Sequence, residues 1–538
     1  IRGPGSVLWG PDAFAGIVNL VPLTGKDVNG VDAGVSYGAP GDQESFYINM
    51  GRDGGHWDAF LSLGGRNGEE DTTFCNIARF WKTATKPYSP EDRYGEEWPG
   101  NAQYLTVAGN FSFRDWITLS GMISDYSRPY AMTGPDRDLT WRESRSAPFG
   151  FFKIEAKKDI DEVSALRFTG TYSRVNPEIE IINRTLNSKE QATYAELIYD
   201  RSFLAGKTLV TGGLSFREKD ITDATIWESY FPDYLSESNE LLLPILKMED
   251  YRTQLLSAFC QFRQKIGAVD FWLGFRYDDH NAYKDHVSYN AGAVWKPSSQ
   301  WLLKALYGTA YRTPFARQLR LEDEPELESI ETGNLQIAWK PARYVSMTAT
   351  GYLSRVRNHT MEDAYAGLSQ PNRQDSEGVE LECTVTPSEK LEVAANLTLL
   401  DNDGPDETYH YNDYSYFDPV EGKWVKHYTD LRYPFDTGAK SLFNLLCTWR
   451  PFDHLSLFGR IGYVGPRDLV YARGEAFRSL PGVWLADLSS VLRNIAGTGL
   501  DLRVSVKNLT DRDYETPGTY STIWGDPLSA EIMLSKRW

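Results

Sequence analysis

The feature that most constrains this chain is a period-two alternation of apolar and polar residues, which recurs in short segments from residue 31 to the end. In the last segment Ala530, Ile532 and Leu534 share one face, because successive side chains of a strand point to opposite sides. Glu531 and Arg537 lie on the other face. The chain is therefore expected to form many β-strands, each with one apolar and one polar face.

Composition favours a membrane barrel over a set of soluble domains. Hydrophobic residues make up 41% of the 538 residues, mean hydropathy is −0.45, and no apolar run approaches the roughly 20 residues of a spanning helix. A transmembrane β-barrel has such a composition, since only every second strand residue meets lipid. Aromatic residues, at 13%, suit the belts that such barrels place at both membrane interfaces.

The connections between the alternating segments are alternately short and long. We assign 22 segments, the first at 31–38 and the last at 529–538. The long connections run near residues 66–100, 128–148, 221–250, 311–333, 401–438 and 511–527. The sequence thus predicts an all-β fold, a 22-stranded antiparallel transmembrane β-barrel, a strand number typical of plugged outer-membrane transporters. A soluble β-propeller would show a repeat of about 40–50 residues, and we find none.

Charge and short motifs argue against other classes of function. The net charge of −18 argues against a nucleic-acid partner, which requires a basic surface. Residues 34–38 match G-x-S-x-G, but they lie in an alternating strand and not in a strand-to-helix turn, so we expect no enzyme. Three aspartates and two histidines cluster between Asp278 and His286 and are interpreted as a solvated polar loop. We accordingly expect no bound metal or cofactor.

The opening stretch, residues 1–21, differs from the rest because glycines interrupt it repeatedly before a short strand at 17–21. It closely resembles the end of the plug domain in TonB-dependent outer-membrane receptors. The matching positions are Arg2, Gly3, Pro4, Leu8, Gly10, Ala13, Gly16, Val18 and Asn19. Two positions depart from the family's pattern: Trp9 replaces the usual Tyr, and Ala15 replaces one of a pair of glycines.

Later stretches resemble the barrel of the same family, in the family's order. They are residues 307–314, 324–328, 376–382 and 506–514, and Trp538 fits the terminal aromatic of such barrels. The resemblance implies that residues 1–28 are the C-terminal end of a plug domain and that residues 29–538 are the transmembrane barrel with long extracellular loops. It also implies that the rest of the plug and a TonB-binding segment precede Ile1.

The same resemblance implies TonB-dependent active uptake of a scarce nutrient across the outer membrane of a Gram-negative bacterium. The ligand would be a ferric siderophore-like chelate, the family's commonest cargo; cobalamin, another metallophore or an oligosaccharide are alternatives. The partners would be TonB, through the missing N-terminal segment, and the lipid and lipopolysaccharide around a monomer whose C-terminus is periplasmic. An ungated passive pore, if the plug is absent, and a surface adhesin without transport are alternatives of another class.

Candidate ligand-binding residues come from the long connections. Aromatic side chains offer rigid area and hydrogen bonding for ring-bearing ligands, and they gather at Tyr409, Tyr411, Tyr414, Tyr416, Trp424, Trp227 and Tyr230. Arg312 and Arg317 could bind an anionic chelate through charge-assisted hydrogen bonds. Two alternatives stay open: the aromatic loop could pack against itself, and the arginines could form ion pairs with Glu322, Asp323, Glu324 and Glu326.

Overall fold

The computed structural model of this chain describes residues 5–14, 16–69, 101–114, 116–133, 140–181, 184–227, 246–314, 318–319, 324–363, 367–433, 438–470, 477–517 and 522–538. These residues are mostly β-strand, with two short α-helices ahead of the first strand, α1 (Ser6–Trp9) and α2 (Gly25–Val28). Among them, no helix has both the length and the apolar character needed to cross a membrane.

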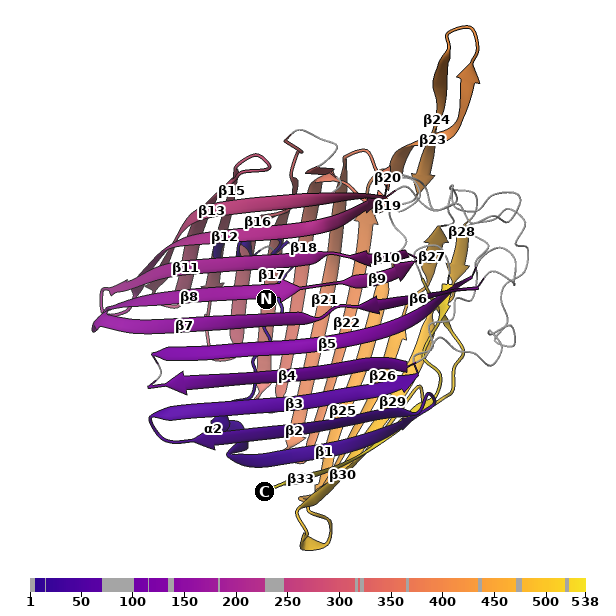
Figure 1. Cartoon of the computed structure of the whole chain (residues 1–538). Helices are drawn as coiled ribbons and strands as arrows, with labels where there is room; N and C mark the ends of the chain where they lie inside the picture. Colours follow the sequence, from indigo (N-terminus) through magenta and orange to yellow (C-terminus); the bar gives the residue numbers. More distant parts are fainter. Residues whose placement is uncertain are drawn as a thin grey trace.

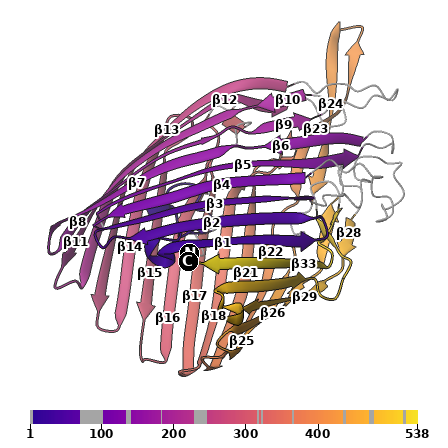
Figure 2. The same ribbon diagram turned by 60° about the horizontal axis from the view of Figure 1, so that its bottom comes forward.

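Within the described residues, 22 antiparallel strands close into one barrel (Figures 1 and 2). The strands are β1 (Gly30–Ala39), β2 (Gln43–Asp53), β3 (Trp57–Glu69), β4 (Asn101–Phe113), β5 (Ile117–Thr133), β7 (Phe149–Asp161), β8 (Ser164–Val175), β11 (Lys189–Phe203), β12 (Thr208–Trp227), β13 (Leu246–Ile266), β14 (Val269–His280), β15 (His286–Trp295), β16 (Trp301–Arg312), β17 (Glu328–Ala342), β18 (Val345–His359), β21 (Asn372–Ser388), β22 (Leu391–Asp403), β25 (Ser441–Phe452), β26 (Leu455–Val464), β29 (Val483–Leu492), β30 (Leu500–Lys507) and β33 (Ser529–Arg537).

The first and last strands close the barrel. In their antiparallel register Val35 faces Leu534 and Tyr37 faces Ile532. This pairing removes the sheet edge, whose backbone groups would otherwise lack partners in a membrane. The predicted fold class is therefore confirmed. Because the strand number is even, β1 begins and β33 ends at the same end of the barrel.

The two ends of the barrel differ in their connections. At one, the short-turn end, β21 joins β22 through residues 389–390 and β25 joins β26 through residues 453–454. At the other, the long-loop end, most connections are long and contain strands of their own. Three of these, β6 (Thr140–Ser146), β9 (Glu178–Ile181) and β10 (Arg184–Asn187), extend the barrel sheet. The rest form four separate hairpins: β19 (Glu362–Asp363) with β20 (Gly367–Leu368), β23 (Glu407–Asp418) with β24 (Lys423–Tyr433), β27 (Arg467–Val470) with β28 (Phe477–Leu480), and β31 (Glu515–Pro517) with β32 (Thr522–Trp524).

The outer surface of the barrel carries an apolar belt. Leu214, Leu256 and Leu381 point outward from their strands and remain exposed. Near the short turns the belt ends in exposed tryptophans, which are Trp295, Trp301, Trp339 and Trp449. Aromatic side chains at this height match the interfacial belt of transmembrane barrels. The alternation seen in the sequence thus separates a lipid-facing outer surface from a polar lumen.

The segment ahead of the first strand lies inside the barrel. Helix α1 contacts β14 through Gly274, next to Val7, and through Arg276, next to Gly10. Gly274 and Arg276 belong to the face of β14 opposite the exposed Phe275, so α1 is on the lumenal side. Helix α2 packs against β2 and β3, where Asp58 accepts the backbone N–H groups of its first two residues at 2.8 and 2.7 Å.

Candidate ligand-binding surface and lumen

The aromatic hairpin, which we define as β23 with β24, projects from the long-loop end and stands away from the barrel (Figures 1 and 2). Its strands pair with each other and belong to a sheet separate from the barrel. At its base the ring of Tyr409 is buried, 4% exposed, and lies 5.2 Å from that of Tyr433. Toward the tip Tyr416 is 48% exposed. Tyr411, Tyr414 and Trp424 lie on the same two strands.

The other predicted ligand residues are spread more widely. Trp227 ends β12 at the long-loop end. Arg312 ends β16 at the same end, beside the connection that precedes β17. Tyr230 and Arg317, together with Arg2, Gly3 and Pro4 of the plug pattern, lie outside the described residues. The structure therefore places Tyr409 and Tyr416 on one projecting hairpin. A contribution to ligand binding from the connection that holds Trp227 and Tyr230 stays a prediction.

Arg312, whose side chain is 33% exposed, belongs to a charge cluster at the long-loop end whose other members are largely buried. It forms an ion pair with Glu328 and donates a hydrogen bond to the carbonyl of Thr360 at 3.1 Å. Nδ1 of His359 lies 3.2 Å from Oε1 of Glu328, and its Nε2 lies 3.0 Å from Oε1 of Glu407. The side chains of His359, Glu328 and Glu407 are only 13%, 8% and 7% exposed. We call Arg312, Glu328, His359 and Glu407 the rim clamp.

The rim clamp joins the aromatic hairpin to the barrel wall, because Glu407 is the first residue of β23. Asn372, at the start of β21, donates to Oε2 of Glu407 at 2.9 Å. One residue further along β23, the carbonyl of Thr408 accepts the N–H of Gln370 at 2.7 Å. Charged and neutral hydrogen bonds together hold the base of the hairpin against the barrel strands β18 and β21.

A second buried network lies in the lumen, where α1 meets the wall. Nε of Arg276 lies 2.7 Å from Oδ1 of Asp278, and these side chains are 2% and 1% exposed. The hydroxyl of Tyr311 donates to Oδ2 of Asp278 at 3.1 Å. The interpretation of Asp278 as part of a solvated loop is therefore wrong, because its side chain points into the barrel and is enclosed there. Among the described residues, no group of three or more His, Cys, Asp or Glu side chains is arranged to hold a metal ion.

The lumenal segment is anchored just beyond α1. Gly10 ends the helix with φ +79°, a left-handed value that favours glycine and explains this position of the plug-like pattern. Asp12 then accepts hydrogen bonds from the N–H and the hydroxyl of Thr313, both at 2.9 Å, and its own N–H donates to the carbonyl of Tyr311 at 3.0 Å. The other carboxylate oxygen of Asp12, Oδ2, lies 3.7 Å from the guanidinium of Arg217.

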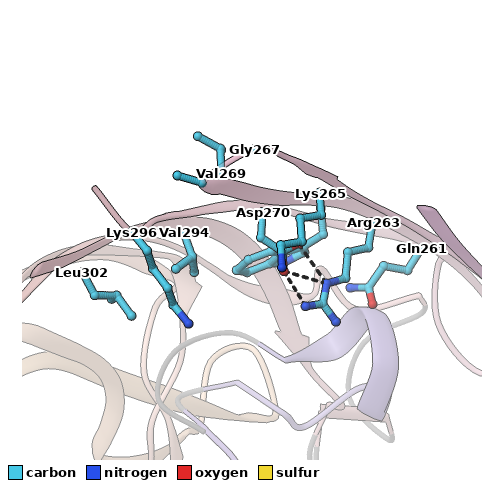
Figure 3. Close-up of a pocket in the computed structure, with 11 residues that line it drawn as sticks. Gln261, Arg263, Lys265, Gly267, Val269, Asp270, Val294, Lys296 and Leu302 are labelled. Carbon is cyan, nitrogen blue, oxygen red and sulfur yellow. Dashed lines mark hydrogen bonds and ion pairs between the residues drawn. The ribbon is translucent and has the colours of Figure 1, made fainter. Parts of the chain in front are cut away.

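The lumenal wall also holds a recess near the short-turn end, with a volume of about 750 Å³ (Figure 3). Its charged lining is Arg263, Lys265, Lys296 and Asp270, and Arg263 is paired with Asp270. Lys265 and Lys296 form no ion pair with a described residue. The recess, which we call the basic recess, therefore has excess positive charge facing the lumen.

Sequence reasoning missed the rim clamp and the basic recess. His359 and Glu407 are 48 residues apart in the chain, and neither lies in a recognisable motif. The sequence showed only charged residues at the ends of alternating segments. Such a position does not indicate which other residue the charge will pair with. Period-two alternation puts Arg276 on the same face of its segment as Asp278, but alternation does not distinguish a pair of these side chains from two hydrated ones.

Comparisons with known proteins agree with this architecture. The model of the family described as "TonB dependent receptor-like, beta-barrel" matches residues 37–509. A curated relative, the vitamin B12 transporter BtuB of Vibrio vulnificus, is 21% identical over 352 residues, which cover 63% of this chain and 50% of that protein. The chain thus spans about half the length of this relative.

Solved structures show the same fold at low sequence identity. The ferric-catecholate import receptor Fiu of E. coli matches with a TM-score of 0.73 and 13% identity, covering 100% of this chain and 85% of that one. The FrpB iron transporter of Neisseria meningitidis matches with a TM-score of 0.75 and 13% identity, covering 100% and 86%. The family match extends over most of the barrel strands described above, and the chain belongs to the TonB-dependent receptor family.

Proposed function

We propose that this chain forms the barrel and the C-terminal end of the plug of a TonB-dependent transporter, which takes up a ferric siderophore-like chelate through the outer membrane. The observation that carries the proposal is the aromatic hairpin, which projects from the long-loop end of a closed barrel. Exposed tyrosines such as Tyr416 suit ring-bearing ligands. The proposed role is transport without catalysis, with the long-loop end extracellular and the C-terminus periplasmic.

Two further observations support an anionic cargo. The basic recess places Lys265 and Lys296 on the lumenal wall toward the short-turn end, where an anionic chelate would leave the barrel. The fold neighbours Fiu and FrpB are described as a ferric-catecholate receptor and an iron transporter. Transport would further require TonB, bound by a segment preceding the plug.

The direct test is mass spectrometry of the ligand that co-purifies with the full-length protein from iron-limited cells. We expect an iron chelate, and we expect the triple variant Y411A/Y414A/Y416A to bind it about tenfold or more weakly, because three aromatic contacts are lost. Tyr344→Ala is the matched control, since Tyr344 is also exposed but lies in a turn at the short-turn end. Unchanged affinity of the triple variant would show that the hairpin is not the binding surface.

Cobalamin is a second candidate cargo, because the curated relative from Vibrio vulnificus is a vitamin B12 transporter. Uptake of labelled cobalamin and of a ferric chelate, each measured with and without TonB, separates these cargoes. Uptake of either one that disappears when TonB is deleted supports the transporter. Large ungated currents of the full-length protein in planar bilayers would instead indicate a passive pore.

A further inference from the structure

One histidine links the base of the aromatic hairpin to the barrel wall by charge. Both ring nitrogens of His359 face carboxylate oxygens, Nδ1 that of Glu328 at 3.2 Å and Nε2 that of Glu407 at 3.0 Å. A carboxylate only accepts hydrogen bonds, whereas a neutral imidazole has one donor and one acceptor nitrogen. Both contacts are hydrogen bonds only when the ring carries two protons. The geometry is therefore that of an imidazolium.

The charges of the rim clamp balance in this state. Two cations, Arg312 and the His359 imidazolium, face two carboxylates, Glu328 and Glu407; Arg312 is 33% exposed, and the other three side chains have little access to water. Unpaired charge in such a site is costly. The neighbouring strand β21 contributes only neutral polar groups here, Asn372 and Gln374, which donate to Glu407. Among these four side chains, the charges thus balance only when His359 is protonated.

The clamp lies beyond the part of the wall that faces hydrocarbon. On the outer face of β18, the apolar belt ends with Leu353, and the next outward residues are Arg355 and Arg357. Arg357 pairs with Glu331 at 2.7 Å, and Arg355 pairs with Asp375 at 3.1 Å. Ion pairs between neighbouring strands, such as these, are destabilising where the strands face lipid. The strand has therefore left the hydrocarbon before it reaches His359.

We propose that His359 is the positioning residue of the aromatic hairpin and that its second proton fastens the hairpin base to the barrel rim. Glu407 is the moving partner, since it begins the hairpin, whereas Glu328 and Arg312 belong to the wall strands β17 and β16. When the ring loses a proton, one of its nitrogens presents a lone pair to a carboxylate and the clamp carries an excess negative charge. The ion pair that joins Glu407 to the ring is then lost, and the hairpin base is held by neutral hydrogen bonds such as those from Asn372 and Gln370, so the hairpin can move away from the rim.

The direction of the pH dependence follows from the environment of the ring. Burial alone would lower the pKa of His359, but the hydrogen bonds and charges of Glu328 and Glu407 outweigh it and raise the pKa to about 9. Because the pKa of His359 is raised in the closed clamp, the proton stabilises the clamp, and this stabilisation is complete at pH values below the ordinary pKa of 6.5. This stabilisation is lost as the pH rises through about 9. The hairpin is therefore pinned near neutral pH and released in alkali.

Electron paramagnetic resonance distance measurements on the full-length protein test this inference. Spin labels are placed at the hairpin tip, Val420→Cys, and at the rim, Lys189→Cys, after replacing the four native cysteines with serine. Val420 is 92% exposed, so a label there disturbs no packing. We expect one narrow distance distribution at about pH 6, and a broader and longer one at about pH 10, with a midpoint near the pKa of the imidazolium.

Three variants complete the test. His359→Gln should give the broad distribution at both pH values, and His359→Arg, whose charge is fixed, the narrow one at both. His410→Gln is the matched control, because His410 is an exposed hairpin histidine paired with Asp430 outside the clamp, and it should behave as the parent does. A parent distribution that is the same at both pH values, or a narrow one for His359→Gln at about pH 6, would overturn the proposal. The readout is a distance, so it holds whatever ligand the hairpin binds.

Discussion

At the scale of single residues, the lumenal pair of Arg276 and Asp278 is the most enclosed charged contact described above. Both side chains are almost fully buried, and they are also tied to Tyr311 and Ser215 by hydrogen bonds. Removing one member of a buried pair leaves the other charge without a partner in a site that water does not reach. The loss of Asp278 should therefore affect stability far more than the loss of an exposed carboxylate.

We predict that Asp278→Ala lowers the free energy of unfolding by about 3–5 kcal/mol. The matched control is Asp270→Ala, which breaks the pair with Arg263, where the two side chains are 23% and 56% exposed. That change should cost at most about 1 kcal/mol, because water screens and solvates the remaining charge. Denaturant unfolding of the barrel in lipid vesicles measures both values. Equal losses in the two variants would contradict the burial of the Arg276 pair.

Residue-level contacts were only partly predictable from the sequence. Alternation places Arg276 and Asp278 on the polar face, and the structure agrees. For Arg312 the sequence suggested ion pairs with acids at 322–326, of which Glu322 and Asp323 lie outside the described residues, and it did not suggest the pair with Glu328 that the structure shows. The reason is the register of β16 and β17, which sets Arg312 directly opposite Glu328. Register depends on turn geometry and on packing across strands, and the order of residues does not give it.

At the scale of elements, the aromatic hairpin should be dispensable for barrel folding, because its two strands form a backbone ladder with each other, in a sheet separate from the barrel. We predict that replacing residues 407–433 with a short Gly/Ser linker leaves a folded barrel with weakened ligand binding. Heat-modifiable electrophoretic mobility measures folding of the barrel. Deletion of β33 is the contrasting variant, and it should abolish folding because that strand closes the sheet. A hairpin deletion that also fails to fold would show that this connection supports the wall.

Strands of the barrel were predictable as elements because lipid imposes a strict alternation on them. Both the number of strands and their order along the chain agree with the structure. The long connections were harder, since beyond the membrane both faces of a strand meet water and the alternation weakens. The aromatic hairpin, for example, was recognised only as an aromatic loop at 401–438. Its projection from the rim depends on the contacts of Glu407 and Thr408, which are distant in sequence.

At the scale of the whole molecule, the barrel separates three environments. Its outer belt is apolar, its lumen holds the plug-like segment and the basic recess, and its long-loop end carries the rim clamp and the aromatic hairpin. The sequence indicated the first of these directly, through alternation. The path of the lumenal segment could not be read in the same way, because hydrogen bonds such as that from Thr313 to Asp12 join residues 301 positions apart.

This separation predicts that the same substitution destabilises the barrel to different extents on the two faces of one strand. Leu381 points outward near the middle of the apolar part of β21, so Leu381→Arg should lower the free energy of unfolding in lipid vesicles by about 2–4 kcal/mol, the cost of a cation at the bilayer midplane. Thr384 lies on the lumenal face of the same strand. Thr384→Arg should change stability by about 1 kcal/mol or less, because a wet lumen solvates the guanidinium. Equal destabilisation by the two arginines would mean that the outer belt of the barrel does not face lipid.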